Sequence, residues 1–340
     1  MKLLEVLNGN KIFPPPLWMM RQAGRYLPEY QLVRKKNKNF IGMCLDSKSS
    51  CEVTLQPIRR FNFDASIIFS DILLVPWALG RKVDFLPNVG PILDPISNLN
   101  DIDVYNSHNF LQKLSPIKKN ISLTKQKLPN NIPLIGFSGA PWTIMTYMLE
   151  GGTSRDFNNT RLCLWTKKDL FEKIFYSLID AIVDFLYLQA ISGADILMIF
   201  DTWSSHVPAT ERKWIVFEAH QKIIQKLNEK NVYLPIISFP KGLNEALVNY
   251  VENVNVNCLA VDHYADIQKL HKILPKEIAL QGNLDPILLT TDNTQMIDIV
   301  DDLINIAKQR PYIFNLGHGI LPNSKISKVD EIISYIRYGV

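Results

Sequence analysis

Two arginines stand directly after a short apolar run near the amino terminus. Leu17–Met20 follows three prolines, is too short for a buried helix, and ends at the loop Arg21–Arg25 (RQAGR). We expect a strand that delivers two guanidinium groups into a loop whose glycine permits close backbone approach. Guanidinium groups bind carboxylates through paired hydrogen bonds, and nearby side chains add positive charge: Arg34, Lys35, Lys36 and Lys38. The pattern predicts an anion site.

A carboxylate, Asp71, directly follows another predicted strand. Strand alternation places Ile67 and Phe69 on the same face as Asp71. Phe137 and Phe200, on neighbouring predicted strands, are expected to add to this apolar surface. We therefore expect a carboxylate above a dry apolar floor, where it interacts strongly with a positive charge on a ligand. An isolated aspartate at a strand end more often caps a helix, so Asp71 alone does not define a site.

Eight short apolar segments alternate with helical patterns along the chain. They are residues 17–20, 65–70, 133–138, 195–200, 234–239, 258–261, 278–281 and 312–316. This alternation, without a linker or a shift in composition, predicts one α/β domain over residues 1–340, a (β/α)₈ TIM-type barrel. An open doubly wound sheet is the alternative, although GxGxxG and GxxxxGKS are both absent from the sequence.

The residues that follow the predicted strands are the candidates for function, because barrel enzymes build their sites there. They are Arg21–Arg25, Asp71, Gly139–Trp142, Asp201–Trp203, Asp262-His263, Gln281–Asp285 and Gly317-His318-Gly319. Helices are predicted at 50–61, 105–128, 142–150, 169–191, 209–229, 243–252, 266–274 and 293–309, and residues 73–103 are predicted to be irregular with short strands.

Composition excludes several classes of protein. A formal net charge of +4 with interspersed signs does not indicate a nucleic-acid binder. The amino-terminal residues contain Glu5 and Asn8 where a signal peptide needs an apolar run, and no segment has eighteen consecutive apolar residues. The four cysteines show no metal-binding spacing, so we interpret them as reduced thiols of a cytoplasmic protein that contacts no membrane.

Several blocks of the sequence resemble the uroporphyrinogen decarboxylase family, in its order and at its intervals, over about residues 14–323. The blocks are MRQAGRYLPEY, CEVTLQPIRRFNFDASIIFSDILLVP, IGFSGAPWTIMTYMLEGG, LQGNLDP and FNLGHGILP. The resemblance implies a somewhat distorted single-domain barrel that forms a homodimer. It also implies an enzyme without metal or organic cofactor that converts uroporphyrinogen III to coproporphyrinogen III by removing CO₂ from four acetate side chains.

By the same resemblance, the substrate-contacting residues are Arg21, Gln22, Ala23, Gly24, Arg25, Asp71, Tyr147, Thr202 and His318. Asp71 is expected to stabilise the protonated pyrrole and the arginines to hold substrate carboxylates. Thr202 replaces a serine found in some relatives, which keeps the hydroxyl. The stretch after Arg34, KKNKNFIGM, is more basic than is typical of the family.

The identity of the proton donor stays open between Arg21, a poor acid in water, Asp71, which would need a raised pKa, and His318. Two other functions are alternatives. A corrinoid-linked methyltransferase of the same superfamily would need a zinc-binding cluster of thiolate and imidazole groups, and no histidine is followed two residues later by cysteine. A non-catalytic tetrapyrrole binder would use the arginines but not Asp71.

Overall fold

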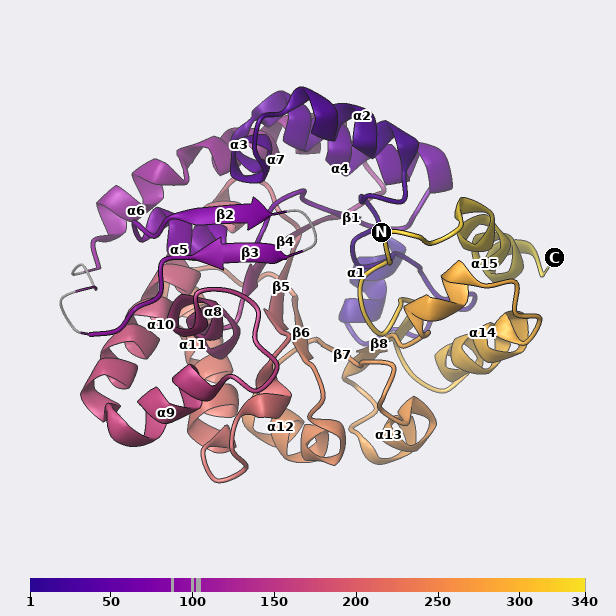
Figure 1. Cartoon of the computed structure of the whole chain (residues 1–340). Helices are drawn as coiled ribbons and strands as arrows, with labels where there is room; N and C mark the ends of the chain where they lie inside the picture. Colours follow the sequence, from indigo (N-terminus) through magenta and orange to yellow (C-terminus); the bar gives the residue numbers. More distant parts are fainter. Residues whose placement is uncertain (87–88, 99–100, 102–104, 340) are drawn as a thin grey trace.

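A curled sheet of seven parallel strands forms the centre of the molecule in the computed structural model, which describes residues 1–86, 89–98, 101 and 105–339 (Figure 1). The strands, in their order across the sheet, are β1 (Ser66–Ile67), β4 (Leu134–Gly139), β5 (Ile196–Asp201), β6 (Ile236–Pro240), β7 (Cys258–Ala260), β8 (Ala279–Gln281) and β9 (Tyr312–Ile313). Every pair of neighbours is parallel. The predicted α/β barrel class is confirmed.

The first predicted strand takes the eighth position only in part. Leu17 forms a single parallel bridge to Phe314, and on the other side its carbonyl accepts a hydrogen bond from the Asp64 amide at 2.9 Å. The Met20 amide donates to the side chain of Asn315, at 3.0 Å, instead of to backbone. Residues 17–20 therefore lie between β9 and β1 without forming a regular ladder with either strand. The barrel is distorted at this position.

Helices surround the strands as an outer ring (Figure 1). Following the chain, they are α1 (Lys2–Leu7), α2 (Pro28–Lys36), α3 (Phe40–Leu45), α4 (Ser47–Phe61), α5 (Leu74–Ala78), α6 (Ser107–Lys113), α7 (Ser115–Lys127), α8 (Pro141–Glu150), α9 (Asn158–Thr166), α10 (Lys168–Ile191), α11 (Ala219–Glu229), α12 (Leu247–Asn253), α13 (Ile267–Ile273), α14 (Met296–Ile304) and α15 (Ile326–Tyr338). A π-helical turn, Lys213–Glu218, precedes α11.

One predicted helix is divided in the structure. The helix expected over 105–128 is two helices, α6 and α7, because Pro116 begins a new helix at the first turn of α7. The basic residues Arg34, Lys35 and Lys36, for which no element was predicted, form the last turn of α2. Cations at a helix carboxyl end interact favourably with the helix dipole.

The excursion after Asp71 contains a hairpin of β2 (Val83–Leu86) and β3 (Gly90–Leu93), as the predicted short strands suggested. The Leu93 amide donates to the Gly151 carbonyl at 2.9 Å, which ties the hairpin to the end of α8. In Figure 1 the hairpin lies in front of the strands and α1 behind them.

Aromatic rings fill the interior between the central strands. Phe137, Phe200 and Phe239 come from β4, β5 and β6 and contact one another edge to face, with ring centroids 5.5 and 6.1 Å apart. On the outer side of β4, a Cβ at Gly136 would lie 2.8 Å from the Gln189 side chain of α10, which bonds both the amide and the carbonyl of Phe137. Alternation along β4 thus separates the interior of the barrel from the packing of its helices.

Helix α10 is long and apolar enough to cross a membrane by length and composition, but 67% of that window is buried inside the fold. It packs against α8, α11 and β4. This burial is typical of a core helix.

Candidate functional site

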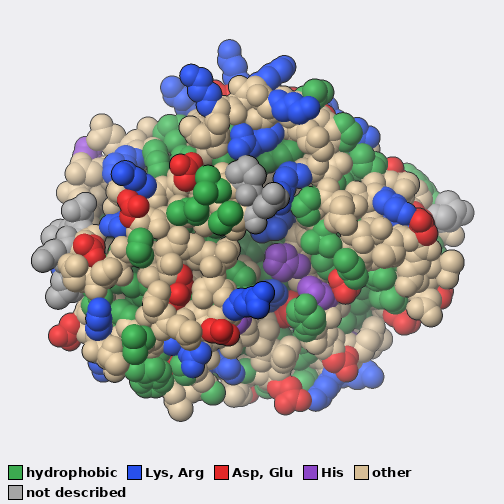
Figure 2. Space-filling model, viewed as in Figure 1, with side chains coloured by type: hydrophobic (Ala, Val, Ile, Leu, Met, Phe, Trp, Pro, Cys, Tyr) green, Lys and Arg blue, Asp and Glu red, His purple; other side chains and the backbone are tan. Residues whose placement is uncertain are grey.

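The carboxyl ends of the strands form an opening that we call the mouth, defined by Arg21, Asp71, Tyr147, Trp203, Lys241 and His318. Figure 2 shows a hollow near the centre of this face, where Lys, Arg and His side chains gather. Two cavities lie away from the mouth, one of about 510 Å³ beside Asp64 and Arg337 and one of about 130 Å³ beside Tyr105 and Lys113. Neither contains a predicted site residue.

Arg21 occupies the left-handed backbone region, with φ of 59°. Hydrogen bonds of the next residue, Gln22, hold the loop in this conformation. Gln22 is buried, its amide donates to the Met19 carbonyl at 2.9 Å, and its side chain donates to the Ala65 carbonyl at 3.2 Å. The loop is therefore fastened to the chain just before β1, and the Arg21 side chain remains exposed.

Asp71 is half-buried at the end of β1, where one carboxylate oxygen accepts the Leu73 amide at 2.8 Å. Burial raises the pKa of Asp71 from 3.8 to about 6, while the Leu73 hydrogen bond and the Arg21 charge act in the opposite direction. The carboxylate is thus mostly ionised at neutral pH.

Tyr147 on α8 shares this neighbourhood. Burial raises the pKa of the Tyr147 hydroxyl, Asp71 raises it further, and Arg21 lowers it. The structure therefore brings together Arg21, Asp71 and Tyr147, three residues from different parts of the sequence that were predicted to belong to one site.

The predicted apolar floor is only partly correct. Phe137 and Phe200 do contact each other in the barrel interior. Phe69 instead packs against the rings of Tyr30 and Phe40, at 5.9 and 5.7 Å, because α2 and α3 fold over the end of β1.

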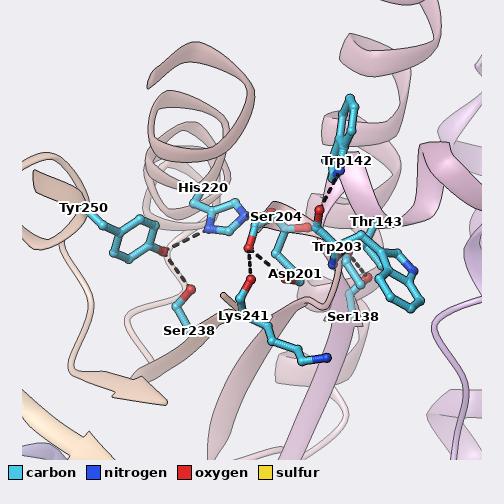
Figure 3. A network of polar contacts seen from close by, with 11 residues as sticks. Ser138, Trp142, Thr143, Asp201, Trp203, Ser204, His220, Ser238, Lys241 and Tyr250 are labelled. Carbon is cyan, nitrogen blue, oxygen red and sulfur yellow. Dashed lines mark hydrogen bonds and ion pairs between the residues drawn. The ribbon is translucent and has the colours of Figure 1, made fainter. Parts of the chain in front are cut away.

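The turn that carries Thr202 and Trp203 is held from behind by a buried polar network (Figure 3). Thr143 donates to the Asp201 carboxylate at 2.6 Å and accepts the Trp203 amide at 3.1 Å. His220 Nε2 lies 3.3 Å from the other Asp201 oxygen. Asp201, which sequence reasoning placed on the rim, thus points away from the mouth. Thr202, the next residue, is half-buried.

The network continues outside the sheet, where His220 Nδ1 lies 2.9 Å from the Tyr250 hydroxyl, itself 2.7 Å from Ser238 Oγ. All three side chains are fully buried. Buried polar groups that satisfy one another in this way fix a unique arrangement.

His318 lies between two glycines at the end of the last strand. The Gly319 amide donates to His318 Nδ1 at 2.7 Å, which leaves Nε2 as the protonated nitrogen of the neutral ring. Burial, together with the charges of Arg21 and Lys241, lowers the pKa of His318 from 6.5 to about 3. His318 is thus a neutral hydrogen-bond donor in the mouth.

Arg25 and Arg34 lie on the α2 side of the mouth. Both lower the pKa of the Tyr30 hydroxyl, which burial raises, while Asp71 raises it. Arg25 is exposed, and the half-buried Ala23 and Gly24 join it to Arg21. A Cβ at Gly24 would lie 3.1 Å from the Arg21 carbonyl, so the glycine permits a tight turn there.

Sequence reasoning missed Lys241, which follows β6 and whose charge affects His318. The signal was present, since Pro240-Lys241-Gly242 directly follows the predicted strand 234–239, whose end was left out of the candidate residues. In the described part of the chain, no three His, Cys, Asp or Glu side chains converge as metal ligands would.

Known proteins resemble the chain over nearly its whole length. The model of the family described as Uroporphyrinogen decarboxylase (URO-D) matches residues 1–338. Curated uroporphyrinogen decarboxylases from Rhodospirillum rubrum and Rickettsia africae are 39% and 43% identical to the chain, over 98% and 97% of it and 96% and 94% of their own lengths.

Solved structures show the fold. A methyltransferase from Methanosarcina mazei superposes with a TM-score of 0.79 at 15% identity, covering 98% of this chain and 97% of that one. A B12-independent methionine synthase from Shewanella sp. W3-18-1 superposes with a TM-score of 0.56 at 11% identity, covering 95% and 93%. Those two likenesses concern the barrel alone, whereas the match of the family model over the whole length shows that the chain belongs to the uroporphyrinogen decarboxylase family.

Proposed function

We propose that the chain removes CO₂ from the four acetate side chains of uroporphyrinogen III, giving coproporphyrinogen III, without a cofactor. The observation that carries the proposal is the convergence of Asp71 with Arg21 and Tyr147 at the mouth, in a chain that belongs to this family. Eight carboxylates on the substrate match a mouth whose exposed charges are mainly guanidinium and ammonium groups.

The chemistry requires an electron sink. A proton added to the pyrrole carbon beside the acetate gives an iminium cation, and the bond to the carboxylate then breaks, releasing CO₂ and passing its electron pair to the cation. The resulting methylene carbon takes up a second proton to become a methyl group, and the ring carbon loses its proton. Each acetate thus consumes one proton overall.

Asp71 is suited to stabilise the cation. Its carboxylate is ionised at neutral pH and half-buried, so it interacts strongly with a positive charge that exists only during the reaction. The same oxygens accept hydrogen bonds from pyrrole N–H groups and so orient the macrocycle. Arg21 and Arg25 hold substrate carboxylates, with Gln22, Ala23 and Gly24 shaping the loop between them.

The remaining contacts follow from the arrangement. Neutral His318 donates from Nε2 to a substrate carboxylate, Tyr147 lies near Asp71 and Trp203, and the Thr202 hydroxyl is a further substrate contact. A pKa of about 3 leaves no imidazolium at neutral pH, which disfavours His318 as the proton donor. Arg21 and Asp71 both stay candidates for that role.

Anaerobic incubation of the purified chain with uroporphyrinogen III tests the activity. We expect CO₂ and a series of products with seven, six, five and four carboxylates, separated by chromatography. Binding of the porphyrinogen without release of CO₂ would favour the alternative of a tetrapyrrole binder.

We also infer a homodimer in the cytoplasm. The dimer is supported by the family resemblance, and light scattering coupled to size exclusion tests it. A reducing compartment is supported by Cys44, Cys51, Cys163 and Cys258, which are buried and unpaired.

A further inference from the structure

We propose that Lys241 is a carboxylate-binding residue of the mouth, which holds an anionic side chain of the substrate other than the one that reacts. The inference rests on the proposed function and extends it to a residue outside the predicted set.

The backbone of Lys241 is fixed on both sides. Its amide donates to the Asp201 carbonyl at 3.1 Å, and its carbonyl accepts the Ser204 hydroxyl at 2.8 Å. The next residue, Gly242, has φ of 79°, and a Cβ there would lie 2.8 Å from Cβ of Ser205. Lys241 is therefore positioned by the same turn that carries Thr202 and Trp203 (Figure 3).

The ammonium group of Lys241 has no anionic partner. Among the described residues, it forms no hydrogen bond or ion pair, and it lies 5.9 Å from the centroid of the Trp203 ring. Asp262 attracts it, but both Asp262 oxygens already accept backbone amides, of Gly242 at 2.7 Å and Tyr264 at 3.0 Å.

This arrangement is unfavourable without a ligand. Burial lowers the pKa of Lys241, and the like charge of Arg21 lowers it further. A partly desolvated cation without a partner gains more from binding a carboxylate than a hydrated surface lysine does. The side chain is thus prepared for an anion that the folded chain does not itself supply.

The position of Lys241 complements that of the arginines. In Figure 3 its amine extends away from the Asp201 network, under Trp203. Its charge and that of Arg21 both reach His318, whereas Arg25 and Arg34 act near Tyr30 on the α2 side. Carboxylates on different pyrroles of one macrocycle can therefore be held by Lys241 near His318 and by Arg25 near Tyr30.

A lysine also suits the task chemically. Four acetates react in turn, so the substituent that reaches this position changes between turnovers. An ammonium on a flexible stem accepts carboxylates at different distances and orientations, whereas the planar guanidinium fork requires one geometry. We therefore assign Lys241 to retention of the intermediates.

The test compares Lys241→Gln and Lys241→Arg with Lys272→Gln, a matched change of an exposed lysine on α13. For Lys241→Gln we expect KM for uroporphyrinogen III to rise about tenfold, which is about 1.4 kcal/mol, with kcat within about threefold of the parent. Intermediates with seven to five carboxylates should accumulate. Lys241→Arg should recover part of the affinity, and Lys272→Gln should change nothing.

The variant Lys241→Met distinguishes a structural role of Lys241 from a role in substrate binding, because it keeps the packing on Trp203 and removes the charge. We expect its Tm to equal or exceed that of the parent, because an unpaired, partly buried charge is lost, while substrate affinity falls. An unchanged KM in Lys241→Gln, or a loss of kcat alone that Lys241→Arg does not restore, would overturn the assignment.

Direct binding of coproporphyrin III, measured by quenching of tryptophan fluorescence, tests the role of Lys241 independently of the proposed decarboxylase function. If the parent chain binds this tetracarboxylate but releases no CO₂ from uroporphyrinogen, the proposed function fails while the role of Lys241 is still measured. Equal affinity of the parent and Lys241→Gln would then reject the Lys241 proposal.

Discussion

Gly319 packs directly against the side chain of Arg21, so that a Cβ at this glycine would lie 2.6 Å from Cγ of the arginine. Gly317, two residues earlier, approaches the neighbouring loop instead, and its Cβ would lie 2.7 Å from Cα of His263. Gly319 therefore leaves room for the Arg21 side chain in the mouth, whereas Gly317 leaves room for the backbone of His263.

Gly319→Ala should displace Arg21 and reduce kcat/KM by about tenfold or more, because misplacement of a binding group by an ångström is costly, while the fold is retained. Gly317→Ala is the contrast: a clash with backbone is relieved only by moving the loop, so Tm should fall. Kinetics and thermal melts of both variants check this. Full activity in Gly319→Ala would show that the position of Arg21 is not critical.

Asp71→Asn removes the charge but keeps an oxygen for the Leu73 amide. If the carboxylate stabilises the pyrrole cation, turnover should fall roughly 10²-fold or more, mainly in kcat. Asp71→Glu keeps the charge at a different reach and should retain more activity than Asn. Single-turnover kinetics, with folding followed by circular dichroism, decide the matter, and an Asn variant within about threefold of the parent would remove the electrostatic role.

The raised pKa of Asp71 predicts a pH dependence of stability. The folded chain holds the Asp71 proton up to about pH 6 and the unfolded chain only to about 3.8, so the folded state binds more protons in this window. The free energy of unfolding contributed by Asp71 therefore falls as pH rises from about 4 to 6.

Asp71→Asn should consequently be more stable than the parent above pH 6, with the difference disappearing below about pH 4. The pKa of His318 is lowered, so its contribution runs in the opposite direction, and only the difference between the two proteins isolates Asp71. Urea denaturation across this range measures it. A constant difference would contradict a raised pKa.

Arg25→Lys keeps the charge and loses the fork that binds a carboxylate through two hydrogen bonds. We expect weaker retention of substrate, by about tenfold, and accumulation of partly decarboxylated intermediates. Arg59→Lys is the control, because Arg59 forms a surface ion pair with Glu52. An unchanged product distribution in Arg25→Lys would identify Arg25 as a surface residue.

Thr143→Val should loosen the turn behind the mouth. The change leaves the Asp201 carboxylate and the Trp203 amide without a shared partner, which costs about 1–3 kcal/mol of stability. Because the Trp203 turn also holds Lys241, KM should rise as well. Thr143→Ser keeps the hydroxyl and should behave like the parent, as melts and steady-state kinetics can show.

The sequence by itself determined the fold class and most of the strands. Short apolar runs such as Leu134–Gly139 and Ile196–Asp201 form buried strands, because the strands of a parallel sheet are covered on both faces and carry near-continuous apolar patterns. Since barrel sites lie at strand ends, Asp71, the Arg21 loop and His318 could be placed together before any coordinates. The blocks that resemble the uroporphyrinogen decarboxylase family pointed to the same residues as substrate contacts.

Only the tertiary structure decided which way the side chains at those ends point. Asp201 and Thr202 are adjacent in sequence, yet the first is buried against Thr143 and His220 and the second lies at the turn. Phe69 does not form part of the predicted apolar floor, because α2 and α3 fold over it and supply the rings of Tyr30 and Phe40 as its partners.

Lys241 shows the same limit. Its role depends on Asp201, Ser204 and Trp203, which come from another strand end. Periodicity gives the face of a residue within its own element, whereas the partners on that face come from segments far apart in the chain. Their distances and charges exist only once the barrel has closed.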